Sequence, residues 1–319
     1  MIFEKQILNM YKGMMHTRCD DTETVFYFSP EDFPGLNYER YTFTSYLGDT
    51  LVGYIYTYEN PIPKRLVVFD HGFGGGHRAY MKEIEKLCAH GYTVFSYDHT
   101  GCMESEGKSP RGLAQSLSDL NDCLFALERE ERFSGYDIAV MGHSWGAFST
   151  LNIAPLHPDI SHIVAMCGFV SVEEMIKTFF GGILKGYRKA VLNLERETNP
   201  EYVKFNAIES IMAVDIKALL IYSADDTMCR KHHYDLLKAG LENKKGVTLM
   251  LTDKKWHNPN YTEDAVKLLL DFSKKRAKLA RKKNITKKEK EEFVSSFDWK
   301  KMTEQDEDVW NAIFAHLDN

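Results

Sequence analysis

Two features that are common in exported and membrane proteins are missing from this sequence. No apolar run approaches the length needed to span a bilayer. Residues 1–10 contain no basic stretch followed by an apolar run and a small-residue cleavage site, the pattern of a secretory signal. We therefore expect a cytoplasmic protein that has no stable insertion into a membrane.

Clustered cysteines and an excess of positive charge are also missing. The six cysteines form no Cys-x-x-Cys pair and have no histidine partner at zinc spacing, and their number says little about disulfides. Cys88, Cys123 and Cys167 lie among apolar residues, where a free thiol behaves as a small hydrophobic group. The formal net charge of −6 gives no reason to expect nucleic acid or an anionic membrane as a partner.

The strongest motif lies in residues 137–150. Ile138–Met141 is a short apolar run, typical of a strand that is buried on both faces. Residues 142–146 read Gly-His-Ser-Trp-Gly, which fits Gly-x-Ser-x-Gly, and a run compatible with a helix follows. A strand–turn–helix of this kind is a nucleophile elbow, which exposes the hydroxyl of Ser144 at the carboxyl end of the strand. The alternative is an ordinary turn in which Ser144 only caps the helix.

Apolar strand candidates alternate with helical patterns after residue 65. This alternation predicts βαβ units and an α/β fold with a mainly parallel, doubly wound sheet. The predicted strands are 65–70, 92–97, 138–141, 162–167, 219–223 and 247–252, and the predicted helices are 77–90, 115–132, 232–239 and 262–280. We expect catalytic loops at the carboxyl ends of the strands, which meet at one edge of the sheet.

The part of the chain before residue 65 has a different pattern. Residues 1–20 are predicted to be helical. Three runs rich in Tyr, Phe, Thr and Val follow at Thr24–Phe28, Arg40–Tyr46 and Leu51–Tyr58, and residues 47–49 between the last two are a hairpin signal. We expect these runs to form an antiparallel edge of the sheet.

Residues 170–215 interrupt the alternation. They contain two helical stretches, a Gly181-Gly182 hinge candidate and no strand candidate, which predicts a small helical cap over the strand ends. A helical excursion on the flank of the sheet is the alternative. The cap's apolar residues are candidates for a substrate pocket, or else for the cap's own core: Phe179, Phe180, Ile183 and Leu184. The α/β core is then divided into residues 1–169 and 216–280.

Residues 281–319 form a charged helical tail. The basic run through Lys290 has no interleaved aromatic residues and is followed by acidic residues 304–308, which favours a solvated, charge-paired helix over a nucleic-acid site. Trp310 and the apolar residues after it are expected to dock on the body or on a partner chain, so a homodimer is one prediction.

Partners for a nucleophilic serine follow two later strands. A serine needs a base in hydrogen-bond reach, and the base needs an orienting carboxylate. Asp225 and Asp226 follow one apolar strand, and His257 follows the next within a few loop residues. We favour Asp226 as the orienting group because it stands farther beyond the turn, whereas Asp225 can cap the next turn or helix. An exposed loop histidine is the alternative for His257.

A tetrahedral intermediate also needs two hydrogen-bond donors. The backbone N–H of Trp145, directly after the serine, is one candidate. The backbone N–H of Phe73 is the other, because the glycines of residues 71–76 let main chain approach a substrate closely. The alternative of a phosphate-binding loop is disfavoured, since this loop does not fit Gly-x-Gly-x-x-Gly and no Gly-Lys-Ser/Thr follows.

Together these motifs resemble the α/β-hydrolase superfamily, in the branch of monoglyceride lipases, lysophospholipases and serine aminopeptidase-like esterases. The resemblance covers about residues 40–280 and rests on residues 71–74 and 142–146, the Asp226 turn and His257, in the family order. It departs from the family at Met103, where a second glycine is usual. The resemblance implies a Ser144–Asp226–His257 triad and a variable cap that shapes the acyl or alcohol pocket.

The leading hypothesis is a serine hydrolase that cleaves a small-molecule carboxylic ester through an acyl-enzyme on Ser144. Its acyl group is expected to be an apolar chain or an aromatic acid. A serine peptidase or amidase is the alternative, and a non-catalytic binding protein on the same fold is a more remote one. The serine disfavours dehalogenase and epoxide-hydrolase chemistry, which use a carboxylate nucleophile. The mechanism implies no metal or organic cofactor.

Overall fold

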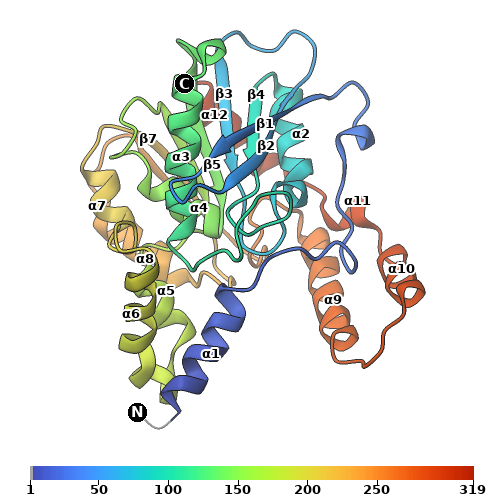
Figure 1. Ribbon diagram of the computed structural model, residues 1–319. Coiled ribbons are helices and arrows are strands. Elements are labelled where there is room, and N and C mark those ends of the chain that lie inside the picture. The colour runs from blue at the N-terminus through green and yellow to red at the C-terminus, as the bar shows by residue number, and fades with distance from the viewer. Residues whose placement is uncertain (1–2) are drawn as a thin grey trace.

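An eight-stranded sheet forms the centre of the molecule (Figure 1). The computed structural model describes residues 3–319. The strands are β1 (Asn37–Thr44), β2 (Thr50–Thr57), β3 (Arg65–Asp70), β4 (Thr93–Tyr97), β5 (Asp137–His143), β6 (His162–Met166), β7 (Lys217–Ser223) and β8 (Val247–Thr252). Their order across the sheet is β1-β2-β4-β3-β5-β6-β7-β8. β1–β2 and β2–β4 are antiparallel pairs and the other pairs are parallel, which confirms the predicted sheet and its antiparallel amino-terminal edge.

Helices cover both faces of the sheet. The α-helices within residues 3–319 are α1 (Glu4–Met15), α2 (Met81–His90), α3 (Gln115–Arg129), α4 (Trp145–Asn152), α5 (Val172–Phe179), α6 (Arg188–Thr198), α7 (Ala207–Met212), α8 (Lys231–Gly240), α9 (Glu263–Leu279), α10 (Lys287–Ser295), α11 (Trp299–Met302) and α12 (Glu307–Leu317). In Figure 1, α3 and α4 lie in front of the sheet and α12 lies behind it. The central strands β4 and β6 are buried throughout, because helices cover both of their faces.

The amino-terminal edge is shorter than predicted. Residues Thr24–Phe28 form no strand and lie outside the sheet. Two local interactions explain the difference. The Asp21 carboxylate accepts hydrogen bonds from the backbone N–H groups of Glu23 and Thr24, which turns the chain. The ring of Phe26 then packs on Trp299, with 6.0 Å between their centroids, so the aromatic residues of this run serve side-chain packing and not strand pairing.

Residues 170–215 leave the body and return to it at neighbouring points. Ala207 N–H donates to the carbonyl of Val170 at 2.8 Å. Between these points lie α5, the 3₁₀-helix η4 (Gly182–Tyr187) and α6, and α7 is a third α-helix beyond the two predicted stretches. Asn206 caps α7 by accepting a hydrogen bond from the backbone of Ile208. α1, from the other end of the sequence, lies beside α6 (Figure 1).

The carboxy-terminal tail combines a projecting part and a docked part. α9 and α10 project from the body in Figure 1, and α10 carries two lysine–glutamate pairs at i,i+4 spacing on its exposed surface. α12 packs on the body, where Trp310 and Leu317 are fully buried in one cluster with residues of α2 and the central strands. Within residues 3–319, no helix has both the length and the apolar character needed to cross a bilayer.

Candidate active site

The turn between β5 and α4 has the tight geometry of a nucleophile elbow. Ser144 has φ 56° and ψ −109°, a backbone conformation that a non-glycine residue rarely adopts. A Cβ at Gly142 would overlap the carbonyl oxygen of Gly146, and a Cβ at Gly146 would overlap the carbonyl of Asp70. Both glycines are therefore needed for the close approach of β3, β5 and α4 that presents the Ser144 hydroxyl.

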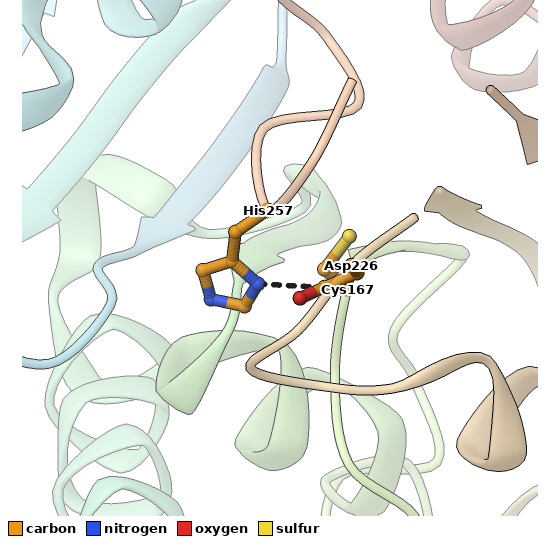
Figure 2. Close-up of side chains that lie close together, drawn as sticks. All are labelled: Cys167, Asp226 and His257. Carbon is orange, nitrogen blue, oxygen red and sulfur yellow. Dashed lines mark hydrogen bonds and ion pairs between the residues drawn. The ribbon is translucent and has the colours of Figure 1, made fainter. Parts of the chain in front are cut away.

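Ser144, His257 and Asp226 form one hydrogen-bonded chain. The Ser144 hydroxyl lies 2.8 Å from His257 Nε2, and His257 Nδ1 lies 2.7 Å from Asp226 Oδ2, the contact drawn in Figure 2. The Asp226 side chain is fully buried and that of His257 is 13% exposed. The three residues come from loops after β5, β7 and β8, whose carboxyl ends meet because the strands are parallel.

The two neighbouring aspartates have separate contacts. Asp226 Oδ1 accepts hydrogen bonds from the backbone N–H groups of Met228 and Cys229, which fixes the carboxylate that faces His257. Asp225 Oδ1 accepts from the backbone N–H groups of Lys255 and Trp256. Asp225 thus caps the loop that carries His257, and not the turn or helix directly after it, because the adjacent strand β8 brings that loop within reach.

The two predicted oxyanion donors lie beside the serine. Phe73 and Trp145 line the same cavity as Ser144, and their rings pack edge to face with 5.1 Å between centroids. Within residues 3–319, neither backbone N–H donates a hydrogen bond to another protein group. The indole N–H of Trp145 donates to the carbonyl of Leu113 at 2.7 Å, which anchors the first turn of α4. Two backbone donors are therefore free to face a ligand at this position.

The serine opens into a mainly apolar cavity of about 250 Å³. Its lining residues are Met14, Met15, Gly72, Phe73, Tyr80, Leu113, His143, Ser144, Trp145, Phe169, Met175, Phe179, Met228 and His257. Phe179, at the end of α5, is a predicted pocket residue that lines it. Among the described residues, the lining contains no Asp, Glu, Lys or Arg side chain. The cavity therefore suits an apolar group attached to the reacting carbonyl.

The other three predicted pocket residues lie elsewhere. Phe180 is 3% exposed and packs on Tyr11, with 6.1 Å between ring centroids. Ile183 is 95% exposed, and Leu184 is partly buried against the main core cluster. α5 ends at Phe179 and the chain continues as the 3₁₀-helix η4, so the helical period used in the prediction does not extend to these residues.

The amino-terminal helix α1 supplies a cavity wall that the sequence analysis missed. Met15 is 5% exposed and Met14 is half exposed, and both line the cavity. Two contacts hold the helix there: Gly112 N–H donates to the carbonyl of Met15 at 3.2 Å, and the Tyr11 hydroxyl donates to Glu195 of α6 at 2.5 Å. The only local signal was a methionine pair in a helical pattern, and such a pattern does not say what the helix packs against.

Glu195 joins three segments around the cavity and gives the fold a pH dependence. Besides Tyr11, it accepts a hydrogen bond from the backbone N–H of Leu113 at 2.9 Å. Burial raises the pKa of this carboxyl from 4.5 to about 7. A raised pKa in the folded state means that the stability contributed by the neutral form is complete below pH 4.5 and is lost as the pH rises through 7. The cost of ionising the group corresponds to about 3 kcal/mol.

Glu195→Gln is therefore expected to be more stable than the wild type at pH 8 and close to it at pH 5. The amide mimics the neutral acid, since its oxygen can accept from Leu113 and its NH₂ can donate to the Tyr11 oxygen. Urea unfolding at both pH values measures the difference in the free energy of unfolding. Glu197→Gln, on the exposed face of α6, is the control and should show no such pH dependence. A Glu195→Gln difference that is independent of pH would contradict the assignment.

Cys167 lies next to Asp226, and both are near His257 (Figure 2). Its sulfur, a carboxylate oxygen of Asp226 and a ring nitrogen of His257 all lie within 4.8 Å of one another. Burial raises the pKa of the Cys167 thiol well above its ordinary value, so the group is a neutral thiol beside the Asp226 carboxylate. These three side chains have the chemistry of metal ligands, but the Asp226–His257 hydrogen bond uses the atoms that an ion would need. Cys167 is thus a polar neighbour of the site, where the sequence suggested only a small hydrophobic residue.

Comparisons with known proteins agree with this fold. Residues 61–242, more than half of the chain, match the family described as serine aminopeptidase, S33. The matched range contains Ser144 and Asp226 and ends before His257. A search of curated protein sequences gave no match.

Solved structures show the same architecture at low sequence identity. The Pyrococcus furiosus esterase Pf2001 superposes with a TM-score of 0.60 and 18% identity, over 81% of this chain and 97% of the esterase. The α/β hydrolase GrgF from a Penicillium species has a TM-score of 0.52 and 17% identity, over 75% of this chain and 98% of its own. An acylaminoacyl peptidase has a TM-score of 0.56 and 19% identity, over 75% of this chain and 41% of its own. The chain belongs to the serine aminopeptidase S33 family of α/β hydrolases.

Proposed function

We propose that this protein is a serine hydrolase that cleaves a carboxylic ester with an apolar acyl group through an acyl-enzyme on Ser144. The Ser144 oxygen attacks the ester carbonyl while His257 Nε2 takes the hydroxyl proton. The backbone N–H groups of Phe73 and Trp145 bind the oxyanion, and the alcohol leaves with the proton returned by His257. Water then attacks the acyl-enzyme by the same route and releases the acid. Asp226 holds the imidazole and stabilises its protonated form.

One observation carries this proposal: the unbroken hydrogen-bond chain from Ser144 through His257 to Asp226. Its two contacts, 2.8 Å and 2.7 Å, are short enough for proton transfer without rearrangement. The strained backbone of Ser144 supports it independently, because such strain is retained where it presents a functional group. An ordinary helix-capping serine needs neither feature, and Ser144 makes no side-chain cap hydrogen bond to α4.

A fluorophosphonate probe tests the nucleophile directly. Intact mass after incubation should show one phosphonyl adduct on the wild-type protein and none on Ser144→Ala, because the reagent reacts only with an activated serine. An unlabelled wild type would contradict the proposal and favour a non-catalytic binding role on the same fold. Labelling of both proteins would place the reactive group elsewhere.

A serine aminopeptidase or amidase is the second candidate, favoured by the family description and by the peptidase among the similar structures. An aminopeptidase must hold a substrate ammonium group, which requires a carboxylate or equivalent acceptor near the serine. The lining side chains give no such group: among the described residues, the cavity lining contains no Asp or Glu side chain. The carboxylate of Asp226 is already hydrogen-bonded to His257. The apolar lining of the cavity therefore favours an ester with an apolar acyl group over an aminoacyl amide as the substrate.

We therefore expect kcat/KM for 4-nitrophenyl butanoate or hexanoate to exceed that for aminoacyl 4-nitroanilides by about 100-fold or more. An unpaired ammonium group would have to be desolvated in the apolar cavity, whereas an alkyl chain gains from burial there. Both substrate series release a chromophore and can be followed in the same buffer, with Ser144→Ala as the blank for spontaneous hydrolysis. A preference for the aminoacyl amides would reverse the choice between the two candidates.

A further inference from the structure

A second hydrogen-bond chain joins the three loops of the site, and it runs through two side chains outside the triad. Gly72 N–H donates to the Tyr80 hydroxyl at 3.1 Å, Tyr80 lies 2.8 Å from His143 Nδ1, and His143 Nε2 lies 2.6 Å from the backbone carbonyl of His257. Gly72 precedes the proposed oxyanion donor Phe73, His143 precedes Ser144 in the sequence, and His257 is the proposed base. One end of the chain is therefore the residue next to the proposed oxyanion donor, and the other end is a backbone group of the proposed base.

The direction of every proton in this chain follows from its ends. A carbonyl oxygen can only accept, so Nε2 of His143 carries the hydrogen. Burial lowers the pKa of His143 to about 3, so the ring is neutral and its Nδ1 accepts from the Tyr80 hydroxyl. The Tyr80 oxygen keeps a lone pair for Gly72 N–H, and burial raises the pKa of Tyr80, which keeps its proton in place. The donor and the acceptor of each of these three hydrogen bonds are thus the same throughout the neutral pH range.

The loop that carries His257 needs such support. Lys254 has φ 59° and Trp256 has φ 46°, so two non-glycine residues just before the base have left-handed backbone conformations. Asp225 holds this loop at Trp256 N–H, and His143 holds it one residue further on, at the carbonyl of His257. At the other end of the chain, a Cβ at Gly72 would overlap the Tyr80 hydroxyl. The contact between Gly72 and Tyr80 therefore requires glycine at this position.

We propose that Tyr80 and His143 are positioning residues that set the relative placement of the oxyanion donor, the nucleophile and the base. This inference rests on the proposed function. It assigns neither residue a proton-transfer step: each acts through backbone groups of the loops that carry Phe73 and His257. Both residues also line the cavity beside Ser144.

Tyr80→Phe tests the proposal, since it removes one oxygen and leaves the ring in place. We expect kcat for 4-nitrophenyl butanoate to fall about 10- to 100-fold, the effect of a misplacement of about 1 Å, with KM changed less than about threefold because the apolar wall is intact. The rate of fluorophosphonate labelling should fall in parallel, because that reaction uses the same oxyanion donors and base.

Tyr56→Phe is the matched control. The Tyr56 hydroxyl makes a buried hydrogen bond to His77 at 2.9 Å, away from the cavity lining. Both variants lose a tyrosine–histidine hydrogen bond and should lose similar stability in a thermal melt, whereas only Tyr80→Phe should lose kcat. Equal losses of kcat in the two folded variants would overturn the proposal, because a general loss of stability would then explain the effect of Tyr80→Phe.

His143 supplies a second, independent test. In His143→Gln the side-chain amide N–H can still donate to the His257 carbonyl, whereas in His143→Leu no donor remains. We expect kcat in the order wild type, then Gln, then Leu, with the Gln variant at least fivefold above the Leu variant. If Tyr80→Phe does not fold, this order decides the matter, and equal activity of the two His143 variants would refute the proposal. An unlabelled wild type would instead refute the proposed function itself, so the two failures are distinguishable.

Discussion

Ser144→Ala is expected to lower kcat for an activated ester by on the order of a millionfold, because the variant has no atom that can form the acyl-enzyme. The fold should be retained, since the Ser144 side chain makes no structural hydrogen bond apart from that to His257 among the described contacts. Residual hydrolysis would come from the oxyanion donors and substrate binding alone. Release of 4-nitrophenol, together with circular dichroism and a thermal melt of the same sample, measures both effects.

Ser149→Ala is the control for this variant. Ser149 lies about one turn further along α4 and is fully buried, and its single O–H is shared between two acceptors, the Asp70 carboxylate and the carbonyl oxygen of Gly146. This change should reduce stability by about 1–3 kcal/mol through an unsatisfied buried partner, while turnover by the folded protein persists. Turnover that survives Ser144→Ala but not Ser149→Ala would show that the wrong serine has been assigned.

Asp226→Asn is expected to lower kcat by about 10⁴-fold with little change in fold. The carboxylate accepts the proton on His257 Nδ1, whereas an asparagine amide can present an N–H there and favour the tautomer with the proton on Nε2. Nε2 could then no longer take the proton of Ser144. The remaining oxygen of the amide can still accept from the backbone of Met228 and Cys229, so the turn after β7 should persist.

Asp225→Asn separates the two neighbouring carboxylates. The Oδ1 atom of Asp225 accepts from the loop that carries His257, and the amide oxygen of asparagine can keep those contacts. We expect a loss in kcat of less than about tenfold from this neutral replacement. Comparable losses in the two variants at the same substrate concentration would mean that the pair acts together, and the assignment of Asp226 as the orienting group would then be incorrect.

The sequence predicted the features that depend on local pattern. The apolar run at Ile138–Met141 and the glycines around Ser144 are local, because a buried strand and a tight turn are specified by residues that are adjacent in the chain. The proximity of His257 and Asp226 could also be predicted, since the carboxyl ends of parallel strands meet at one edge of the sheet.

Other features depend on contacts between distant segments, and no local pattern encodes them. Tyr80 and His143 are 63 residues apart, and their hydrogen bond exists only because η2 (His77–Tyr80) and the end of β5 meet in the fold. The wall formed by Met15 depends on α1 packing against α6, near the middle of the sequence. The run Thr24–Phe28 has strand-forming residues, yet aromatic packing against Trp299 determines its course, so local propensity is overridden.

The position of α1 has a practical consequence for work on this protein. The helix lies outside residues 61–242, which match the family, yet it forms part of the cavity wall beside Ser144. A change at the amino terminus of the expressed protein can therefore change the shape of the cavity beside Ser144. Removal of α1 would take Met14 and Met15 away from the wall beside Ser144 and leave Asp226 and His257 in place, so a preparation without this helix would have a wider cavity at this position.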